Sequence, residues 1–155
     1  MQSCLKTLTG PAGSLLEYTY DADGKELSET TVTGEAKTYT YNAKDLVKSV
    51  TNGRKQTTSY EYDAAGEVTE ADTPEGKVTY SYDSVGRLTS INSSEGSITR
   101  TYDAAGNLAT LKAVNTSGET VISYVYSYDA AGRLVKEESQ TEGITYTYEY
   151  DSLDR

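Results

Sequence analysis

The sequence repeats a pattern of Tyr, Asp, two variable residues and Gly along its whole length. Two degenerate copies begin at Tyr41, where Asn42 replaces Asp, and at Tyr150. The seven marker tyrosines lie 21, 21, 20, 20, 26 and 22 residues apart. Such a period predicts a repeat architecture, in which each unit packs on its neighbours. Five copies keep every marker residue: Tyr20, Asp21 and Gly24; Tyr62, Asp63 and Gly66; Tyr82, Asp83 and Gly86; Tyr102, Asp103 and Gly106; Tyr128, Asp129 and Gly132.

The residues that precede each marker pair alternate in character. From residue 144 to 150, Ile and Tyr occupy the even positions, and Thr and Glu occupy the odd ones. A similar alternation covers residues 122–128 and 78–82. A period of two with many Tyr and Thr residues is typical of a half-buried antiparallel strand, and no segment has apolar residues at helical spacing. We therefore expect one strand to enter each marker pair.

The marker pair is followed by a predicted turn and a second strand. The Asp carboxylate is able to accept backbone N–H groups two residues on, and Gly supplies a left-handed conformation. An apolar residue such as Leu88 then begins the outgoing strand, but Leu88 and Ile91 are three residues apart. We expect a β-bulge to bring both side chains to the same face.

A second turn closes each unit, at Asn52-Gly53, Pro74-Glu75-Gly76, Glu95-Gly96, Ser117-Gly118 and Glu142-Gly143. The sequence thus predicts an all-β protein, an antiparallel meander of β-hairpins with one hairpin per repeat and Tyr concentrated on one face. We expect residues 1–155 to form a single repeat domain of about seven units, extended, twisted and curved, and to be a fragment of a longer protein.

The interval of 26 residues exceeds its neighbours of 20 by six residues. An even difference is expected if both arms of the hairpin lengthen by three residues, since neither strand then changes face. The additional length lies between Leu108 and Ile122. We expect this hairpin to protrude.

Composition excludes several kinds of site. The chain has no His and one Cys, so it has no imidazole metal ligand, no Ser-His-Asp or Cys-His nucleophile and no internal disulfide. Its net charge of −10 argues against nucleic acid or an anionic membrane as the main partner. No apolar run is long enough to span a bilayer, and we expect neither membrane insertion nor a signal peptide.

The segment from Tyr82 to Leu88, Tyr-Asp-x-x-Gly-Arg-Leu, recurs from Tyr128 to Leu134 and resembles the signature of the YD-repeat family, also called RHS repeats. The family includes bacterial RHS polymorphic toxins, shell components of insecticidal toxin complexes and the animal teneurins. The resemblance implies a β-hairpin array that spirals into a hollow shell, which in bacterial members encloses a toxic domain. It also implies a link to carbohydrate binding and, through the teneurins, to adhesion. The chain has no Asp-Pro autocleavage motif and is far shorter than a full shell, so it would form an arc of one.

The Tyr-rich face has two interpretations. As a structural element, Tyr would supply apolar area, pack in cross-strand ladders and direct each hydroxyl group to a polar partner. As a functional element, exposed Tyr rings would stack on sugars. Arg100 replaces the inner Tyr of its strand, and either a cation–π contact with neighbouring Tyr or an anionic ligand would explain it. The candidate ligand-binding residues are Tyr80, Arg100, Tyr124, Tyr126, Tyr146 and Tyr148.

The marker Asp residues occupy the same turn position in successive units. A glycosidase would need two carboxylates with separated pKa values at one unique place, whereas a turn cap recurs in every unit. We therefore expect no catalytic residues. The segment from Asp21 to Glu26 has only part of a calcium loop, and an ordinary turn is the simpler interpretation.

These observations predict a protein that is not an enzyme and that has no cofactor and no metal site. The leading interpretation is a structural segment in the wall of an RHS-type shell, in a secreted or cell-surface protein that encloses a toxin or effector domain. The alternative is a carbohydrate- or protein-binding adhesion module that uses exposed Tyr faces. The expected partners are the remainder of the parent protein, further copies of the chain paired through open sheet edges, and a glycan.

Overall fold

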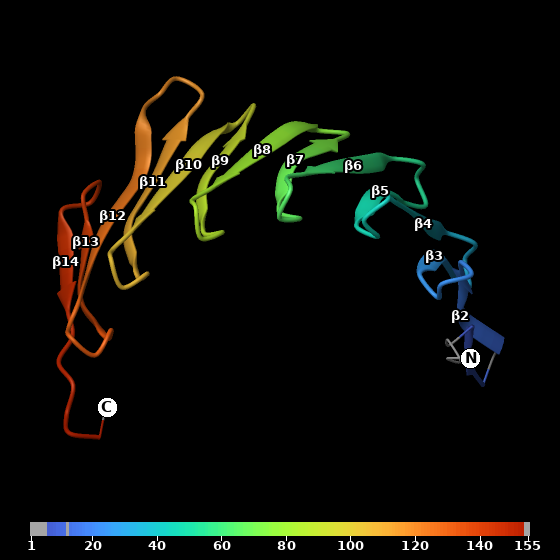
Figure 1. Cartoon of the computed structure of the whole chain (residues 1–155), viewed down its shortest axis with the longest axis horizontal. Helices are drawn as coiled ribbons and strands as arrows, with labels where there is room; N and C mark the ends of the chain where they lie inside the picture. Colours follow the sequence, from blue (N-terminus) through green and yellow to red (C-terminus); the bar gives the residue numbers. More distant parts are fainter. Residues whose placement is uncertain (1–5, 12, 154–155) are drawn as a thin grey trace. The chain divides into compact units, whose positions relative to one another are not determined.

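The computed structural model describes residues 6–11 and 13–153. It consists of fourteen β-strands in one antiparallel meander, in which hydrogen-bonded neighbours follow the order of the chain (Figure 1). This confirms the all-β hairpin meander. The chain divides into two units, residues 1–77 and residues 78–155. The boundary falls within β8 (Gly76–Tyr82).

The first unit is a meander of seven strands ahead of β8. Each strand pairs antiparallel with the next along the chain. Its strands are β1 (Thr7–Gly10), β2 (Gly13–Tyr20), β3 (Glu26–Thr31), β4 (Ala36–Tyr41), β5 (Val47–Thr51), β6 (Thr57–Tyr62) and β7 (Val68–Thr73).

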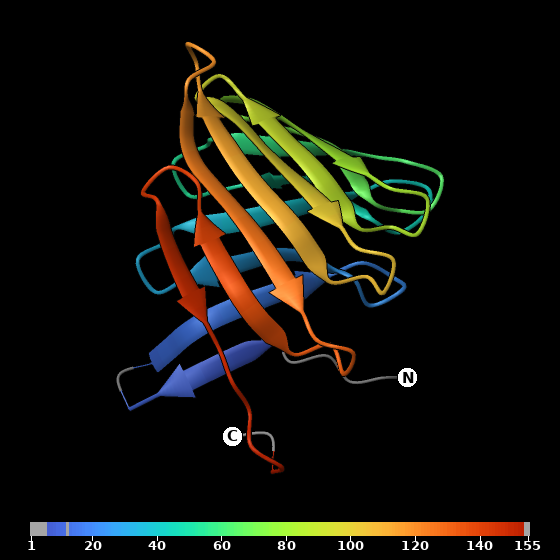
Figure 2. The same cartoon turned by 90° about the vertical axis from the view of Figure 1, so that its left-hand side faces the viewer.

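The second unit continues the pattern from β8 (Figure 2). The last strand ends at Thr147, which is earlier than the alternation up to Tyr150 predicts. The remaining strands are β9 (Leu88–Ser93), β10 (Gly96–Tyr102), β11 (Leu108–Asn115), β12 (Thr120–Tyr128), β13 (Leu134–Ser139) and β14 (Ile144–Thr147).

A bulge accompanies the marker Tyr in every repeat whose pairing is described. Between β8 and β9, Ser81 pairs with Ser90 and Tyr82 pairs with Leu88, so Thr89 is the additional residue. The same shift of one residue occurs at Tyr20, Tyr41, Tyr62, Tyr102 and Tyr128. The bulge brings Leu88 and Ile91 to one face of the strand, as the sequence predicts.

The two faces of the sheet differ in chemistry. Tyr side chains share one face with aliphatic ones, because Tyr39 pairs with Val50, and Tyr80 pairs with Ile91. Hydroxyl groups meet on the other face, where Thr40 bonds Ser49 at 2.6 Å. The expected cross-strand Tyr ladders are therefore wrong in detail. Tyr-bearing strands alternate in the meander with strands that carry no Tyr, and Tyr rings stack along one strand instead, as Tyr124 does on Tyr126 at 6.1 Å.

The long repeat interval forms a longer hairpin between β11 and β12. The arms have eight and nine residues, against six in β9 and seven in β10. The loop also lengthens, from residues 94–95 to residues 116–119. The six additional residues are thus shared by both arms and the loop, rather than by the arms alone. This hairpin extends beyond the neighbouring hairpins of its unit, as predicted (Figure 2).

Neither unit has a conventional core. In the described part of the chain, the buried residues are Ala71, Ala113 and Ser139, and no large side chain is fully buried. Each strand contacts its neighbours in the meander, and no second layer formed by the described residues covers either face of a unit (Figures 1 and 2). The side chains of the sheet are therefore half-buried by one another.

Candidate functional site

The marker tyrosines connect each repeat to the preceding one through their hydroxyl groups. The Tyr102 hydroxyl group donates a hydrogen bond to the backbone carbonyl of Leu88 at 2.8 Å. Within the described residues, four more marker tyrosines make the equivalent bond, at distances of 2.6–3.0 Å. The pairs are Tyr41 to Glu26, Tyr62 to Val47, Tyr128 to Leu108 and Tyr150 to Leu134.

The position of this bond is constant relative to the strand ladder. Between β9 and β10 the backbone pairs end at Thr99 and Ser90, and the hydroxyl group of Tyr102 then reaches the carbonyl of Leu88. In all five bonds, the donor Tyr lies three residues after the last residue of its strand that pairs in the ladder. The acceptor residue lies two residues before the residue with which that last residue pairs. The phenol thus holds the two strands together where the ladder has ended. Phe would lack the donor, which gives a physical reason for a chain with fifteen Tyr and no Phe.

The marker Asp residues hold their turns through backbone hydrogen bonds. Asp83 Oδ1 accepts N–H groups from Val85 and Arg87, both at 3.0 Å. Asp21 and Asp129 each accept the N–H groups two and four residues on in the same way. Asp63 accepts those of Gly66 and Glu67, three and four residues on, and Asp103 accepts that of Asn107. These bonds favour the ionised carboxylate, so the pKa of Asp83 lies below its ordinary value, chiefly through the N–H group of Arg87.

The residue after the turn Gly covers the marker Tyr of the next repeat. Arg87 forms an ion pair with Asp83 at 2.7 Å, and its guanidinium lies 4.5 Å from the centre of the Tyr102 ring. Arg133 holds the same relation to Asp129 and to Tyr150. These cation–π contacts were not predicted from the sequence. The Gly-Arg-Leu part of the signature was the signal that would have found them.

The acidic turn at Asp21 already holds a cation from the chain itself. The ammonium group of Lys25 lies 2.5 Å from Asp45, 3.7 Å from Asp21 and 3.9 Å from Asp23. It also lies 5.8 Å from the centre of the Tyr41 ring. No cluster of three or more metal-ligating side chains is found among the described residues. The turn therefore has the geometry of an internal ion-pair network that connects two repeats.

The candidate ligand-binding residues are spread over several strands of the second unit. Arg100 and Tyr124 pair with Leu111 from its two sides, and Tyr126 and Tyr146 both pair with Glu137. Tyr80 is half-buried on β8, and Tyr124 and Tyr126 are half-buried on β12. Tyr146 on β14 and Tyr148 after it are exposed, at 52% and 39%.

Arg100 has an unusual environment. It pairs with Leu111 of β11 on the Tyr-bearing face. Its Nη1 atom is buried and has no hydrogen-bond partner among the residues that the structure describes. The cation–π contacts found in that part of the chain involve Lys25, Lys37, Arg87 and Arg133, so the expected contact of Arg100 with Tyr is not among them.

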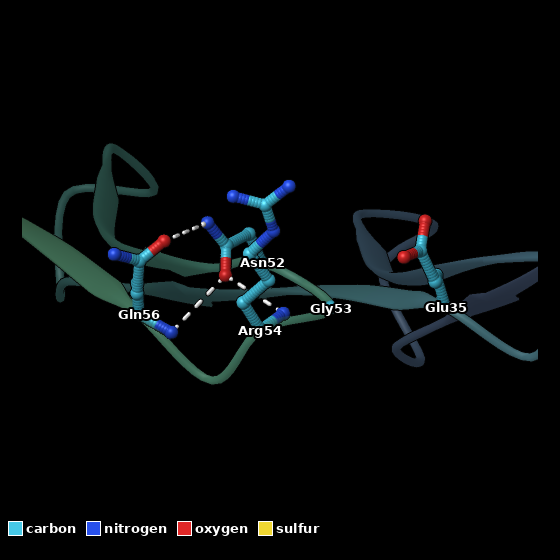
Figure 3. Close-up of a pocket in the computed structure, with 5 residues that line it drawn as sticks. All are labelled: Glu35, Asn52, Gly53, Arg54 and Gln56. Atoms are coloured by element: carbon cyan, nitrogen blue, oxygen red, sulfur yellow. Dashed lines mark hydrogen bonds between the residues drawn. The ribbon is translucent and has the colours of Figure 1, made fainter.

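A polar hollow of about 210 Å³ lies between two turns of the first unit (Figure 3). Asn52 organises one side, since its Oδ1 accepts the backbone N–H groups of Arg54 and Gln56, and its Nδ2 donates to Gln56 Oε1. The carboxylate of Glu35 stands apart on the other side (Figure 3). The polar groups here serve the turn, and no pair of carboxylates converges on a reacting position.

In residues 6–11 and 13–153 the structure contains no helix that is both long enough and apolar enough to cross a bilayer.

Comparisons with solved structures identify the same fold in toxin components. The crystal structure of TcdB2-TccC3 matches with a TM-score of 0.76 and 16% identity, over 91% of this chain and 9% of that chain. The crystal structure of TcdB2-TccC3-Cdc42 matches with a TM-score of 0.76 and 15% identity, over 88% and 8%. A Photorhabdus luminescens Tc holotoxin pore matches with a TM-score of 0.57 and 18% identity, over 85% and 9%. The chain thus spans less than a tenth of these proteins.

No curated protein sequence matches the chain at a significant level. The RHS repeat model, in contrast, matches in five overlapping segments, residues 41–78, 63–98, 82–120, 102–143 and 128–155. Together these segments cover most of the chain, residues 41–155, and they contain four of the five Tyr hydroxyl bonds and the Asp turns at Asp63, Asp83, Asp103 and Asp129. The chain is therefore a member of the RHS repeat family.

Proposed function

We propose that this chain is a non-enzymatic segment of the wall of an RHS-type shell, in a secreted or cell-surface protein that encloses a toxin or effector domain. The observation that carries the proposal is the hydrogen bond from five of the seven marker tyrosines to a backbone carbonyl of the preceding repeat. A sheet one layer thick is ordinarily covered on one face by another layer. Bonds between consecutive repeats let such a sheet extend without one, which is what a thin wall requires.

The comparisons support this proposal. The family model covers most of the chain, and the solved structures of Tc toxin components contain a segment of the same fold. The chain spans only 8% and 9% of those two proteins, so the remaining wall, the enclosed domain and secretion belong to the parent protein. That remainder is the first partner that we propose.

Cryo-electron microscopy of the full-length product of the gene that encodes this chain tests the proposal. We expect a closed shell with these repeats in its wall and with polypeptide density inside. Protease treatment should leave the enclosed segment intact, and the double variant Tyr62→Phe, Tyr102→Phe should expose it sooner. An open particle, or a closed one without interior density, would exclude the wall function.

A second candidate, an adhesion surface for glycans, rests on the exposed rings of Tyr146 and Tyr148. Exposed aromatic rings are suited to stacking on the apolar faces of sugars. A titration of the chain with soluble glycans, followed by Tyr fluorescence, tests it. Saturable binding should disappear in Tyr146→Ala and persist in Tyr146→Phe, which keeps the ring. Binding that is absent, or that is unchanged in Tyr146→Ala, would exclude this surface.

Light scattering on the same samples tests whether copies of the chain associate through open edges. Within the described residues, β14 pairs with β13 along one edge, and its other edge has no partner strand. Unpaired strand edges are templates for pairing with another chain. A mass that increases with concentration would support edge pairing, whereas a constant monomer mass would contradict it.

A further inference from the structure

An apolar hollow of about 270 Å³ opens on the second unit, at the hairpin ends of β9, β10 and β11. Ile98 of β10 lines it, paired with Ile91 on one side and with Ala113 on the other, both of which also line the hollow. Val121 contributes to the lining and is 51% exposed. The hollow therefore offers apolar side chains to solvent on a sheet face that no second layer covers.

Arg100 lies beside this hollow. It follows Ile98 by two residues on β10, and the register between β10 and β11 is regular from Gly96 to Thr101. The two side chains therefore point to the same face, with Cα atoms about 6.6 Å apart. The guanidinium has a buried Nη1 without a hydrogen-bond partner in the described part of the chain. A buried donor without an acceptor is destabilising, and a carboxylate is the acceptor that best fits a guanidinium.

Opposite charges lie on the two sides of Ile98. Glu95 lines its end at the β9–β10 turn, and Arg100 lies on the other side of Ile98. A ligand carboxylate would be repelled by Glu95 and attracted by Arg100. The complementary ligand thus carries an apolar group over Ile98, an acidic group toward Arg100 and, at the opposite end, a basic group toward Glu95.

We propose that this surface binds an extended polypeptide segment that carries an apolar residue over Ile98, an acidic residue two positions further along toward Arg100, and a basic residue on the side of Glu95. Side chains on one face of an extended chain repeat about every 6.6 Å, which is the spacing from Ile98 to Arg100. The hollow is below the size that holds most small-molecule ligands, about 300–1,000 Å³, and accommodates one aliphatic side chain. The inference stands on residues of the second unit alone and does not depend on the wall function.

The test uses the complete 155-residue chain, labelled with nitrogen-15, and a capped seven-residue peptide. The peptide has lysine, leucine and glutamate at its second, fourth and sixth positions, and threonine elsewhere. Titration followed by two-dimensional NMR should show saturable shifts that cluster at Ile98, Arg100 and Ala113. Replacing the peptide's glutamate with glutamine, or its leucine with alanine, should weaken binding by about tenfold or more.

Arg100→Tyr is the decisive variant of the chain. Tyr is the usual residue at this repeat position, so the variant should fold at least as well as the original, yet it should bind the peptide about tenfold more weakly or worse. Arg54→Gln, which removes a positive charge from an exposed turn of the first unit, is the control and should bind normally. Val121→Ser should weaken binding without loss of folding.

Three outcomes would overturn the proposal. The first is an absence of saturable shifts, and the second is equal binding by Arg100→Tyr and the original chain. The third is a stronger response to octanoate, an acyl carboxylate, than to the peptide, which would identify a lipid ligand in place of a polypeptide. None of these outcomes bears on electron microscopy of the parent protein, so the wall function is tested separately.

Discussion

Each repeat turn needs one residue in the left-handed region, three positions after the residue that begins the turn. Gly occupies this position in most turns, as at Gly86 and Gly118, where φ is 83° and 79°. Two turns of the first unit instead place Asp45 and Lys55 there, with φ of 64° and 62°. A residue with a Cβ atom is strained in this conformation. These two positions lie in the turns on either side of β5, so the strain lies in those two turns.

Lys55→Gly should therefore stabilise the chain. Gly relieves the left-handed strain in the folded state, but it also increases the entropy of the unfolded chain. The net effect should raise the free energy of unfolding by about 0.5–1 kcal/mol. Urea denaturation followed by circular dichroism measures it. Arg54→Gly in the same turn is the control. Arg54 is not one of the described residues with a positive φ, so Gly relieves no strain there. This variant should instead lower the free energy of unfolding by about 0.5–1 kcal/mol. Equal effects of the two variants would contradict the strain argument.

Gly96 is a glycine whose substitution should be costly. Its φ is +134°, and a Cβ atom there would lie 2.1 Å from the carbonyl oxygen of Val114. Gly96→Ala should lower the free energy of unfolding by about 3 kcal/mol or more, from backbone strain and from displacement of β11. Gly118→Ala, with φ of +79° and open space around it, should cost only about 1–2 kcal/mol. Thermal unfolding of both variants measures the difference, and equal melting temperatures would exclude the clash.

At the scale of strands, the repeat combines a bulge, an Asp turn and a Tyr hydroxyl bond. The bulge sets the outgoing strand in register with the incoming one, and the turn joins them. Backbone pairing between consecutive hairpins stops short of the marker Tyr, and its hydroxyl group bonds the carbonyl that lies beyond the ladder. The spacing of Leu88 and Ile91 predicts the bulge. The sequence also predicts a polar partner for each hydroxyl group, but it does not identify that partner, because the identity of the partner depends on where the ladder ends.

Removal of one hydroxyl group should measure this bond. Tyr102→Phe keeps the ring, which still contacts Arg87, but leaves the carbonyl of Leu88 without its donor. We expect a loss of about 1 kcal/mol in the free energy of unfolding. Tyr148→Phe is the matched control, since the Tyr148 ring is 39% exposed, and it should change stability by less than about 0.5 kcal/mol. Amide hydrogen exchange should locate the Tyr102→Phe effect in β9 and β10, and a uniform effect along the chain would contradict it.

At the scale of the whole molecule, the chain exposes more surface than a globular protein of its mass. Its accessible surface is 10561 Å², against about 7,700 Å² expected for 16.8 kDa. The excess follows from units one layer thick, in which Ala71 and Ala113 are the buried apolar residues of the described part. Stability in such an array is a sum of local terms and contacts between neighbouring repeats, so repeated turns contribute together.

The five marker aspartates should make the stability of the array sensitive to acid. Hydrogen bonds to the ionised form hold their pKa values below the ordinary 3.8, led by backbone N–H groups at Asp21, Asp63, Asp83 and Asp129, and by the Asn107 side chain at Asp103. Because the pKa is lower in the folded state, the stabilisation is fully present above that ordinary value and is lost as the pH falls through the folded pKa values.

We therefore expect the melting temperature to fall between about pH 4 and pH 2. The double variant Asp83→Asn, Asp129→Asn keeps an acceptor in both turns but has two fewer carboxylates to protonate. Its melting temperature should be lower at pH 7 and should depend less on pH in the acid range. Thermal unfolding followed by circular dichroism across this range gives both values. An unchanged slope in the variant would show that other groups cause the acid sensitivity.

The sequence by itself determined the hairpin meander, the bulge, the Asp turns and the family. These features depend on alternation, on Gly and Asp at fixed offsets and on a period near twenty residues, all of which are local and repeated in every unit. Because the pattern repeats, these features can be predicted from the sequence, since an accidental match in one unit is not reproduced in the next.

The tertiary structure alone decided which groups meet across strands. It placed the hydroxyl group of Tyr102 on the carbonyl of Leu88, set Arg87 over the ring of Tyr102 and left Nη1 of Arg100 without an acceptor beside the hollow at Ile98. These contacts follow from register, bulges and the point at which each ladder ends. A shift of one residue in the register would move every side chain of a strand to the opposite face. Composition and repeat period therefore do not determine which side chains are in contact.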